Sequence, residues 1–409
     1  MSHRRSVLFA ALLVACDAAS AGAPIAPDGG AATDAWAPAD PPAAPVGPLS
    51  LNDVSVLFPL PDRLATKGLL GLDVEAAGGP LLSRERFSAI AVFADPPDPR
   101  LAYESFRVVA LRADPCFPDL HALETDPSAC RTQLRLVAQP LADRLDGTGT
   151  GAVDSAIHLL YDLDAATFES LVDALVDAAE PDPEAPLGID PTMARDGLLS
   201  SRGSAMRALI TTYAGAATLA QLTFVRGDDS FTWRFGGLRV QPDGSLQPIE
   251  IHGIDPGPDG ELVAQQVRFD FGPTSVTPSS DFTRALEPLF GTMSDGRVVL
   301  AASRDLVRDA LAAALEIESP DEHHPDDVDC ASCHVAGPLR ERAELLGHSA
   351  DGLPRFASTL PLRNSTAVEL RVLPSRVRAF GYFREEPVIS QRTINETAAV
   401  VEILNARRR

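Results

Sequence analysis

The sequence predicts an α+β protein, in which a mixed, β-rich body is followed by a small, mostly helical domain. Short runs with strand-like alternation of apolar and polar residues dominate positions 54–271. Helical spacing of apolar residues dominates from position 281 onward. The chain has 409 residues, of which 45% are hydrophobic, so it is long enough to bury a large core.

The individual elements follow from these patterns. We expect strands at residues 54–58, 106–112, 134–139, 156–161, 219–225, 231–240, 249–252 and 267–271. We expect helices at residues 164–179, 204–213, 281–289, 304–315, 339–346 and 395–404. Asp164 is a suitable N-cap for the first of these helices, and Pro181 lies just beyond its end.

The N-terminus predicts export and lipid attachment. A basic stretch, His3-Arg4-Arg5, precedes an apolar run that is too short to span a bilayer. That run ends Leu13-Val14-Ala15-Cys16, which resembles the lipobox of bacterial lipoproteins. The resemblance implies that residues 1–15 are a signal peptide and that Cys16 carries the lipid. A simple cleaved signal followed by an incidental cysteine is the alternative.

Residues 16–50 are predicted to be a disordered tether, because Ala, Pro, Asp and Gly dominate them and they have little apolar surface to bury. The chain carries a formal charge of −22, and Lys67 is its only lysine. No basic stripe is present, which argues against nucleic-acid binding. An acidic body also argues against electrostatic attraction to anionic lipid, so the acyl chains at Cys16 would hold the protein on the periplasmic or cell-surface side of a membrane.

Two cysteines in the body are predicted to pair. Cys116 and Cys130 flank a loop rich in Pro and Asp. A disulfide there suits an oxidising compartment, whereas a redox-active pair is the alternative.

The most informative motif is Cys330-Ala331-Ser332-Cys333-His334, a C-x-x-C-H sequence. Two thiols three positions apart lie about one helical turn from each other, so both can bond to one edge of a porphyrin. The following histidine can then bind the iron from below. Zinc, bound with help from His323 and His324, and a simple Cys330–Cys333 disulfide are the alternatives.

This segment resembles the cytochrome c superfamily over the five motif residues and, more weakly, the residues up to 409. The resemblance implies one covalent haem c, with thioether bonds to Cys330 and Cys333 and with His334 as the proximal iron ligand. It also implies one-electron transfer with a redox partner protein. Residues 316–409 would then be a cytochrome c-like domain, with Arg340 and Arg342 available to the haem propionates.

The sequence departs from that family in one respect: no methionine follows Met293, so the usual distal ligand is missing. We expect His348 to be the distal ligand. His323, His324, Met293 and an open sixth position are the alternatives. An open position would favour a haem enzyme or sensor, and zinc or a disulfide would favour a non-catalytic surface lipoprotein. No catalytic residue is predicted, and residues 51–315 carry no motif that indicates a role.

Overall fold

In the computed structural model, residues 44–409 form one compact unit. The structure describes residues 49–408 except 65–67, 95–97, 145, 181, 228–231, 255–264, 269–274, 277–280 and 296. The predicted signal peptide, Cys16 and the tether as far as residue 48 lie outside the described residues. Within the described part of the chain, no helix is both long enough and apolar enough to cross a membrane.

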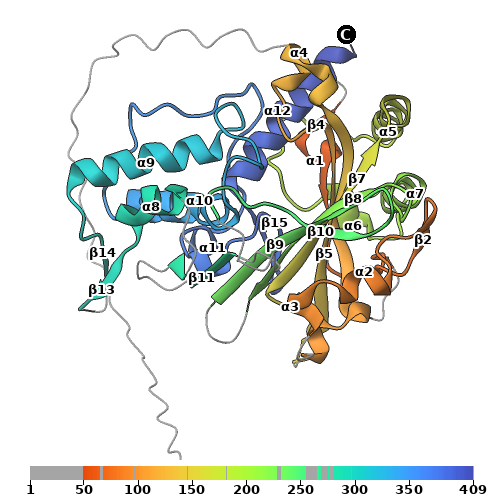
Figure 1. The fold of residues 1–409 in the computed structure, drawn as a ribbon, viewed down its shortest axis with the longest axis horizontal. Helices are drawn as coiled ribbons and strands as arrows, with labels where there is room; N and C mark the ends of the chain where they lie inside the picture. Colours follow the sequence, from red (N-terminus) through yellow and green to blue (C-terminus); the bar gives the residue numbers. More distant parts are fainter. Residues whose placement is uncertain are drawn as a thin grey trace, which may run out of the picture. The chain divides into compact units, whose positions relative to one another are not determined.

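The centre of the unit is an antiparallel sheet, which comprises ten strands among the described residues (Figure 1). Its main path runs β1-β4-β5-β7-β8-β9-β11-β12, while β6 pairs with β5 and β10 pairs with β9. The strands are β1 (Ser55–Leu57), β4 (Phe106–Phe117), β5 (Arg131–Asp143), β6 (Thr150–Ala152), β7 (Ser155–Leu163), β8 (Leu219–Gly227), β9 (Thr232–Val240), β10 (Leu246–Pro248), β11 (Gln265–Arg268) and β12 (Ser275–Val276). Short hairpins are formed by β2 (Glu75–Ala76) with β3 (Gly79–Pro80), β13 (Thr292–Ser294) with β14 (Arg297–Val299), and β15 (Phe380–Phe383) with β16 (Glu386–Ile389).

Helices cover both faces of this sheet (Figure 1). One face packs against helices from the first half of the chain: α2 (Arg84–Ser88), α3 (Ala91–Ala94), α5 (Ala165–Asp177), α6 (Pro191–Asp196) and α7 (Ser201–Tyr213). The other face meets the C-terminal helices: α8 (Asp281–Leu286), α9 (Arg304–Glu318), α10 (Cys330–Leu345), α11 (Val368–Arg371) and α12 (Gln391–Arg407). Two short helices, α1 (Leu51–Val54) and α4 (Ala122–Thr125), complete the set.

Alternation of side chains along the strands allows the sheet to pack against a helical layer on each face. Along β7, Ile157, Leu159 and Tyr161 are fully buried on the face toward the first helical layer. His158 and Leu160 therefore point to the opposite face, because neighbouring side chains of a strand alternate. This second face is the one on which the C-terminal helices lie.

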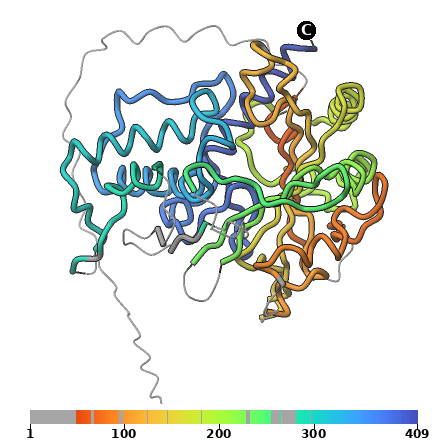
Figure 2. Tube along the Cα trace, viewed as in Figure 1, coloured from red at the N-terminus to blue at the C-terminus, as the bar shows by residue number. Residues whose placement is uncertain are grey.

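The C-terminal segment shares its core with the sheet. The Tyr382 hydroxyl donates to the carbonyl of Phe58 at 2.6 Å, and Tyr382 N donates to Gln139 Oε1 at 2.7 Å. Ser55 and Thr397 join α12 to β1 by a hydroxyl–hydroxyl bond of 2.8 Å. Figure 2 shows the C-terminal helix, in dark blue, beside the red and orange start of the body.

The α+β class is confirmed, with the sheet in the N-terminal body and helices toward the C-terminus. The expected boundary at residues 315–316 falls inside α9, and one hydrophobic core extends across it. Residues 249–252, expected to form a strand, do not continue β10. The regular pairing of β10 with β9 ends at Pro248, although Ile249 N still donates to the carbonyl of Gly237 at 3.0 Å.

Candidate functional site

The C-x-x-C-H motif begins helix α10, which starts nine residues earlier than the expected position 339. Asp329 is its N-cap and accepts a hydrogen bond from Ser332 N at 3.0 Å. Gln265, on β11, accepts a bond from Ala331 N at 2.8 Å, and Thr283, on α8, bonds the Ser332 hydroxyl at 2.9 Å. The first turn of α10 is therefore held in place by two other elements of the fold.

A cavity of about 270 Å³ lies between this first turn and the sheet. Cys330, Cys333 and His334 all line it, so the structure brings together the three residues predicted to hold haem. Strands β5, β7, β8 and β9 contribute mainly apolar side chains to it; these include Val137, Leu160, Val225 and Phe235. The cavity is near the lower end of the range for ligand pockets, roughly 300–1,000 Å³, and it is apolar in the manner typical of them.

His334 is placed by aromatic packing. Its ring centroid lies 4.8 Å from that of Trp233 and 5.2 Å from that of Phe235, both on β9. The ring is partly accessible through the cavity, but Nδ1 is fully buried and has no hydrogen-bond partner among the described residues. Burial lowers the pKa of His334 to about 3, and the positive charge of Arg378 adds to the effect. The imidazole is therefore neutral at physiological pH, the form that binds metals.

Cys330 and Cys333 are half-buried free thiols. Burial raises the pKa of Cys333 to about 11, and burial together with the nearby charge of Asp329 raises that of Cys330 further. Both side chains are therefore neutral thiols near pH 7 in the metal-free protein. Among the residues that the structure describes, no group of three or more His, Cys, Asp or Glu side chains is arranged to hold a metal ion.

One end of the cavity is charged. Arg112 contacts Glu396 at 2.6 Å and Asp114 at 3.4 Å, while Arg135 contacts Asp114 at 2.7 Å. Arg392 also binds Glu396 at 2.6 Å. Three guanidinium groups thus meet two carboxylates in this Arg112–Arg135–Arg392 cluster, which leaves one positive charge in excess.

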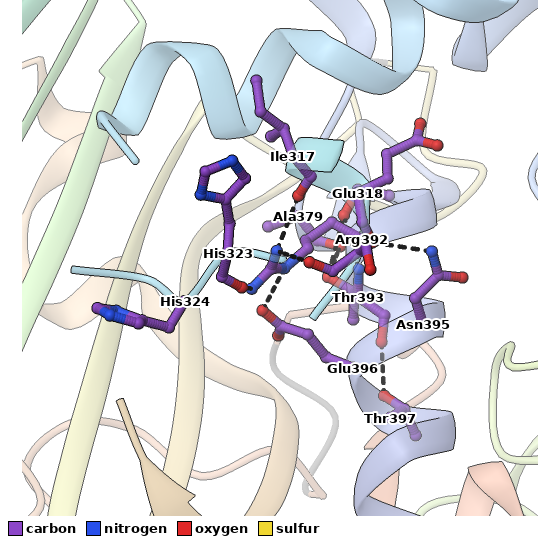
Figure 3. A network of polar contacts seen from close by, with 12 residues as sticks. Ile317, Glu318, His323, His324, Ala379, Arg392, Thr393, Asn395, Glu396 and Thr397 are labelled. Carbon is purple, nitrogen blue, oxygen red and sulfur yellow. Dashed lines mark hydrogen bonds and ion pairs between the residues drawn. The ribbon is translucent and has the colours of Figure 1, made fainter. Parts of the chain in front are cut away.

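Arg392 is fixed by further bonds that Figure 3 displays. Its two terminal nitrogens donate to the carbonyls of Ile317 at 2.8 Å and of His323 at 2.7 Å. The same guanidinium bonds Glu396, one helical turn farther along α12. The C-terminal helix is thereby tied to the segment that leads into the motif.

The two arginines expected near the propionates lie elsewhere. Arg340 forms a buried ion pair with Glu318 at 3.0 Å, and Arg342 donates to the carbonyl of Leu289 at 2.8 Å. Neither lines the cavity that contains the motif. Their helical spacing from His334 turns them toward α9 and the segment after α8 instead.

His348, the expected distal ligand, also lies away from the cavity. It follows the C-terminus of α10, where its N–H bonds the carbonyl of Ala343 at 3.1 Å. Gly347, with φ of 87°, allows the chain to turn there. Fifteen residues of mostly helical chain separate it from Cys333, a span of about 22 Å. Met293 belongs to strand β13 of the β13–β14 hairpin. His323 does not line this cavity, and its Nδ1 lies 3.2 Å from Asp327 Oδ1.

A histidine outside the motif and its flanking segments also lines the cavity. His158 comes from the middle of β7, paired with Val137 on β5 and Thr223 on β8. Burial, with a contribution from the charge of Arg135, lowers the pKa of His158 to about 4. A signal was present in the sequence, since His158 has apolar neighbours on both sides, Ile157 and Leu159.

The cysteines of the body form the predicted disulfide. Cys116, at the end of β4, and Cys130, just before β5, have an S–S distance of 1.99 Å. Cys16 lies outside the described residues, so its lipidation stays a prediction. No protein-family model, no curated protein and no solved structure matches this chain.

Proposed function

We propose that this chain is an exported, lipid-anchored c-type haem protein that transfers single electrons outside the cytoplasm. Cys330 and Cys333 would carry one covalent haem c, and His334 would be the proximal iron ligand. The observation that supports this most directly is the shared cavity: both thiols and the imidazole reach the same apolar space, and His334 Nδ1 has no other partner among the described residues.

The surrounding residues suit haem in two further ways. The apolar side chains from β5, β7, β8 and β9 would exclude water from the iron, which tunes its potential. The excess positive charge of the Arg112–Arg135–Arg392 cluster is suited to a propionate carboxylate at that end of the cavity. When bound, haem would supply a one-electron iron couple, and the protein would set its ligands, its dielectric surroundings and its access to solvent.

The N-terminal features fit the same role. A lipid at Cys16 and a tether through residue 50 would keep the body near a membrane while leaving it free to meet a redox partner protein. The acidic body, with a formal net charge of −22 over the whole chain, would attract a basic partner surface by electrostatic steering.

The test is a pyridine haemochrome spectrum of the protein produced in the periplasm with haem-maturation enzymes. The wild-type chain should keep a c-type α-band after acid–acetone extraction, and the double variant Cys330→Ser/Cys333→Ser should lose it. His323→Ala serves as the matched control, because His323 is near the motif in sequence but does not line the cavity. A colourless wild-type protein, made beside a working cytochrome control, would refute the proposal and leave zinc or a disulfide to be tested by metal analysis and thiol titration.

Reduced protein should also be exposed to carbon monoxide. An electron carrier with two axial ligands should bind it slowly or not at all, whereas the second candidate, a haem enzyme or sensor with an open sixth position, should bind it at once.

A further inference from the structure

We infer that His158, from the sheet, is the distal ligand of the haem iron, opposite His334. This inference rests on the proposed function. It replaces the expected ligand His348 and makes the site a bis-imidazole site assembled from a helix and a strand that are far apart in the sequence.

His158 and the C-x-x-C-H motif line the same cavity. Cys330, Cys333 and His334 enter the cavity from the first turn of α10, and His158 enters it from β7 in the sheet. On β7, His158 and Leu160 point to the cavity face, while Ile157, Leu159 and Tyr161 point away into the other layer. The motif and His158 therefore face the same cavity from two different elements, α10 and β7.

The His158 ring is also available to a ligand. Among the described residues it makes no hydrogen bond, ion pair or ring contact. Its cross-strand neighbours are Val137 and Thr223. The ring of Phe235, which also lines the cavity, contacts His334. The His158 side chain is only half-buried, so its ring is open to a ligand in the cavity.

The other two histidines that line this cavity are less suitable. His252 is exposed at the rim, where its ring contacts Phe282 at 5.8 Å. His324 already has partners: its Nδ1 accepts from Asp326 N at 3.2 Å, and its Nε2 lies 3.5 Å from Asp327. Both come from loops, whereas His158 is held by strand pairing on each side.

A ligand on the inner part of a sheet would be positioned before haem arrives. Strands β5 and β8 hydrogen-bond β7 on both sides, so the Cα of His158 has little freedom to move. A six-coordinate iron whose ligands stay in place during oxidation and reduction suits electron transfer better than catalysis.

The experiment uses the full-length holoprotein and compares wild type with His158→Ala, with His252→Ala and His324→Ala as matched controls from the same cavity. Haem content is measured first by the pyridine haemochrome assay. Spin state is then read from absorbance and electron paramagnetic resonance, and ligand identity from near-infrared magnetic circular dichroism. Carbon monoxide binding is measured on each reduced protein.

We expect wild type and both controls to be low-spin with bis-imidazole signatures and to resist carbon monoxide. His158→Ala should keep its covalent haem, become high-spin and bind carbon monoxide; added imidazole should restore the low-spin spectrum. If His158→Ala does not fold, His158→Met should give a His/Met signature with a higher reduction potential.

Three results would overturn the assignment. A high-spin wild type would show that the sixth position is open. A low-spin His158→Ala variant, or a bis-imidazole spectrum in His158→Met, would show that another residue is the distal ligand. A wild type that carries no covalent haem would refute the proposed function itself, so the two failures are distinguishable.

Discussion

Arg392 Nε lies 2.6 Å from Glu396 Oε1, one turn along α12, and Glu396 Oε2 lies 2.6 Å from Arg112 on β4. This shared carboxylate links the C-terminal helix to the central sheet at the charged end of the cavity. Burial opposes ionisation of Glu396, but Arg392 and Arg112 outweigh it and hold its pKa well below the usual range.

The first prediction concerns the pH dependence of this link. Because the folded-state pKa of Glu396 is lowered, its contribution to stability is full above the unfolded value of about 4.3 and is lost as the pH falls toward the folded value. Glu396→Gln should therefore lower the free energy of unfolding by about 3–5 kcal/mol at pH 7. The difference from wild type should shrink below about pH 4.

Urea unfolding of wild type and Glu396→Gln, at pH 7 and at successively lower pH values, measures this difference in the free energy of unfolding. Glu385→Gln is the control, because Glu385 pairs with Arg144 on the surface at 2.6 Å. It should change stability by less than about 1 kcal/mol. An equal loss for Glu396→Gln at all pH values would contradict the assigned charge state.

The second prediction concerns Arg202, whose side chain is 2% exposed and contacts Asp53 at 3.1 Å and Asp190 at 3.0 Å. Arg202→Met would leave two buried carboxylates without their cation, so it should cost about 3–5 kcal/mol. Arg195→Met, which removes only the exposed pair with Asp196, should cost about 0–1 kcal/mol. Chemical denaturation of both variants compares them. A similarly small loss for Arg202→Met would show that its charge network does not stabilise the fold.

The third prediction concerns the Cys116–Cys130 disulfide, which closes the loop between β4 and β5. Cys116→Ser/Cys130→Ser should lower the free energy of unfolding by about 3 kcal/mol, because the open loop gives the unfolded chain more conformations. Differential alkylation first establishes that the wild-type cysteines are paired, and urea titration then gives the loss. Equal stability of the two proteins under oxidising conditions would rule out a stabilising role.

The fourth prediction concerns the Arg112–Arg135–Arg392 cluster and rests on the proposed haem. Arg135→Gln should lower the reduction potential, since loss of a nearby positive charge favours the oxidised, more positive iron. A shift on the order of 60 mV would correspond to about 1.4 kcal/mol for one electron. Spectroelectrochemical titration measures it, with the exposed Arg195→Gln as the control. An unchanged potential would place the haem away from this end of the cavity.

Sequence patterns predicted much of the framework because their causes are local. Alternation found the central strands, and Asp164 caps α5 as expected, with its carboxylate accepting from Thr167 N at 2.8 Å. The Cys116–Cys130 disulfide could be predicted because both cysteines flank one loop and the chain is predicted to enter an oxidising compartment. The start of α10 differs from the expected position because its N-cap, Asp329, ends an acidic stretch that has no helical spacing of apolar residues.

Only the motif side of the candidate site could be predicted from the sequence. The spacing of Cys330, Cys333 and His334 is the basis of the proposed haem attachment, since three positions make about one helical turn. Its opposite wall could not be inferred, because strand pairing and helix packing bring His158 and Arg135 to the motif across some two hundred positions of chain. Arg112 and Arg135 also look like ordinary solvent-facing charges on strands, and only the docking of α12 makes them part of a buried network.

The place of α12 in the chain has a consequence for biogenesis. Arg392, Thr393 and Glu396 form part of the rim around Cys333, yet they lie more than fifty positions after it. In the export that we propose for this chain, the motif would therefore emerge while this side of the cavity is still open. A maturation enzyme would reach both thiols before α12 arrives, and the helix would then close over a cofactor already in place. Covalent attachment would precede the final folding step, and chains that fold first would exclude haem.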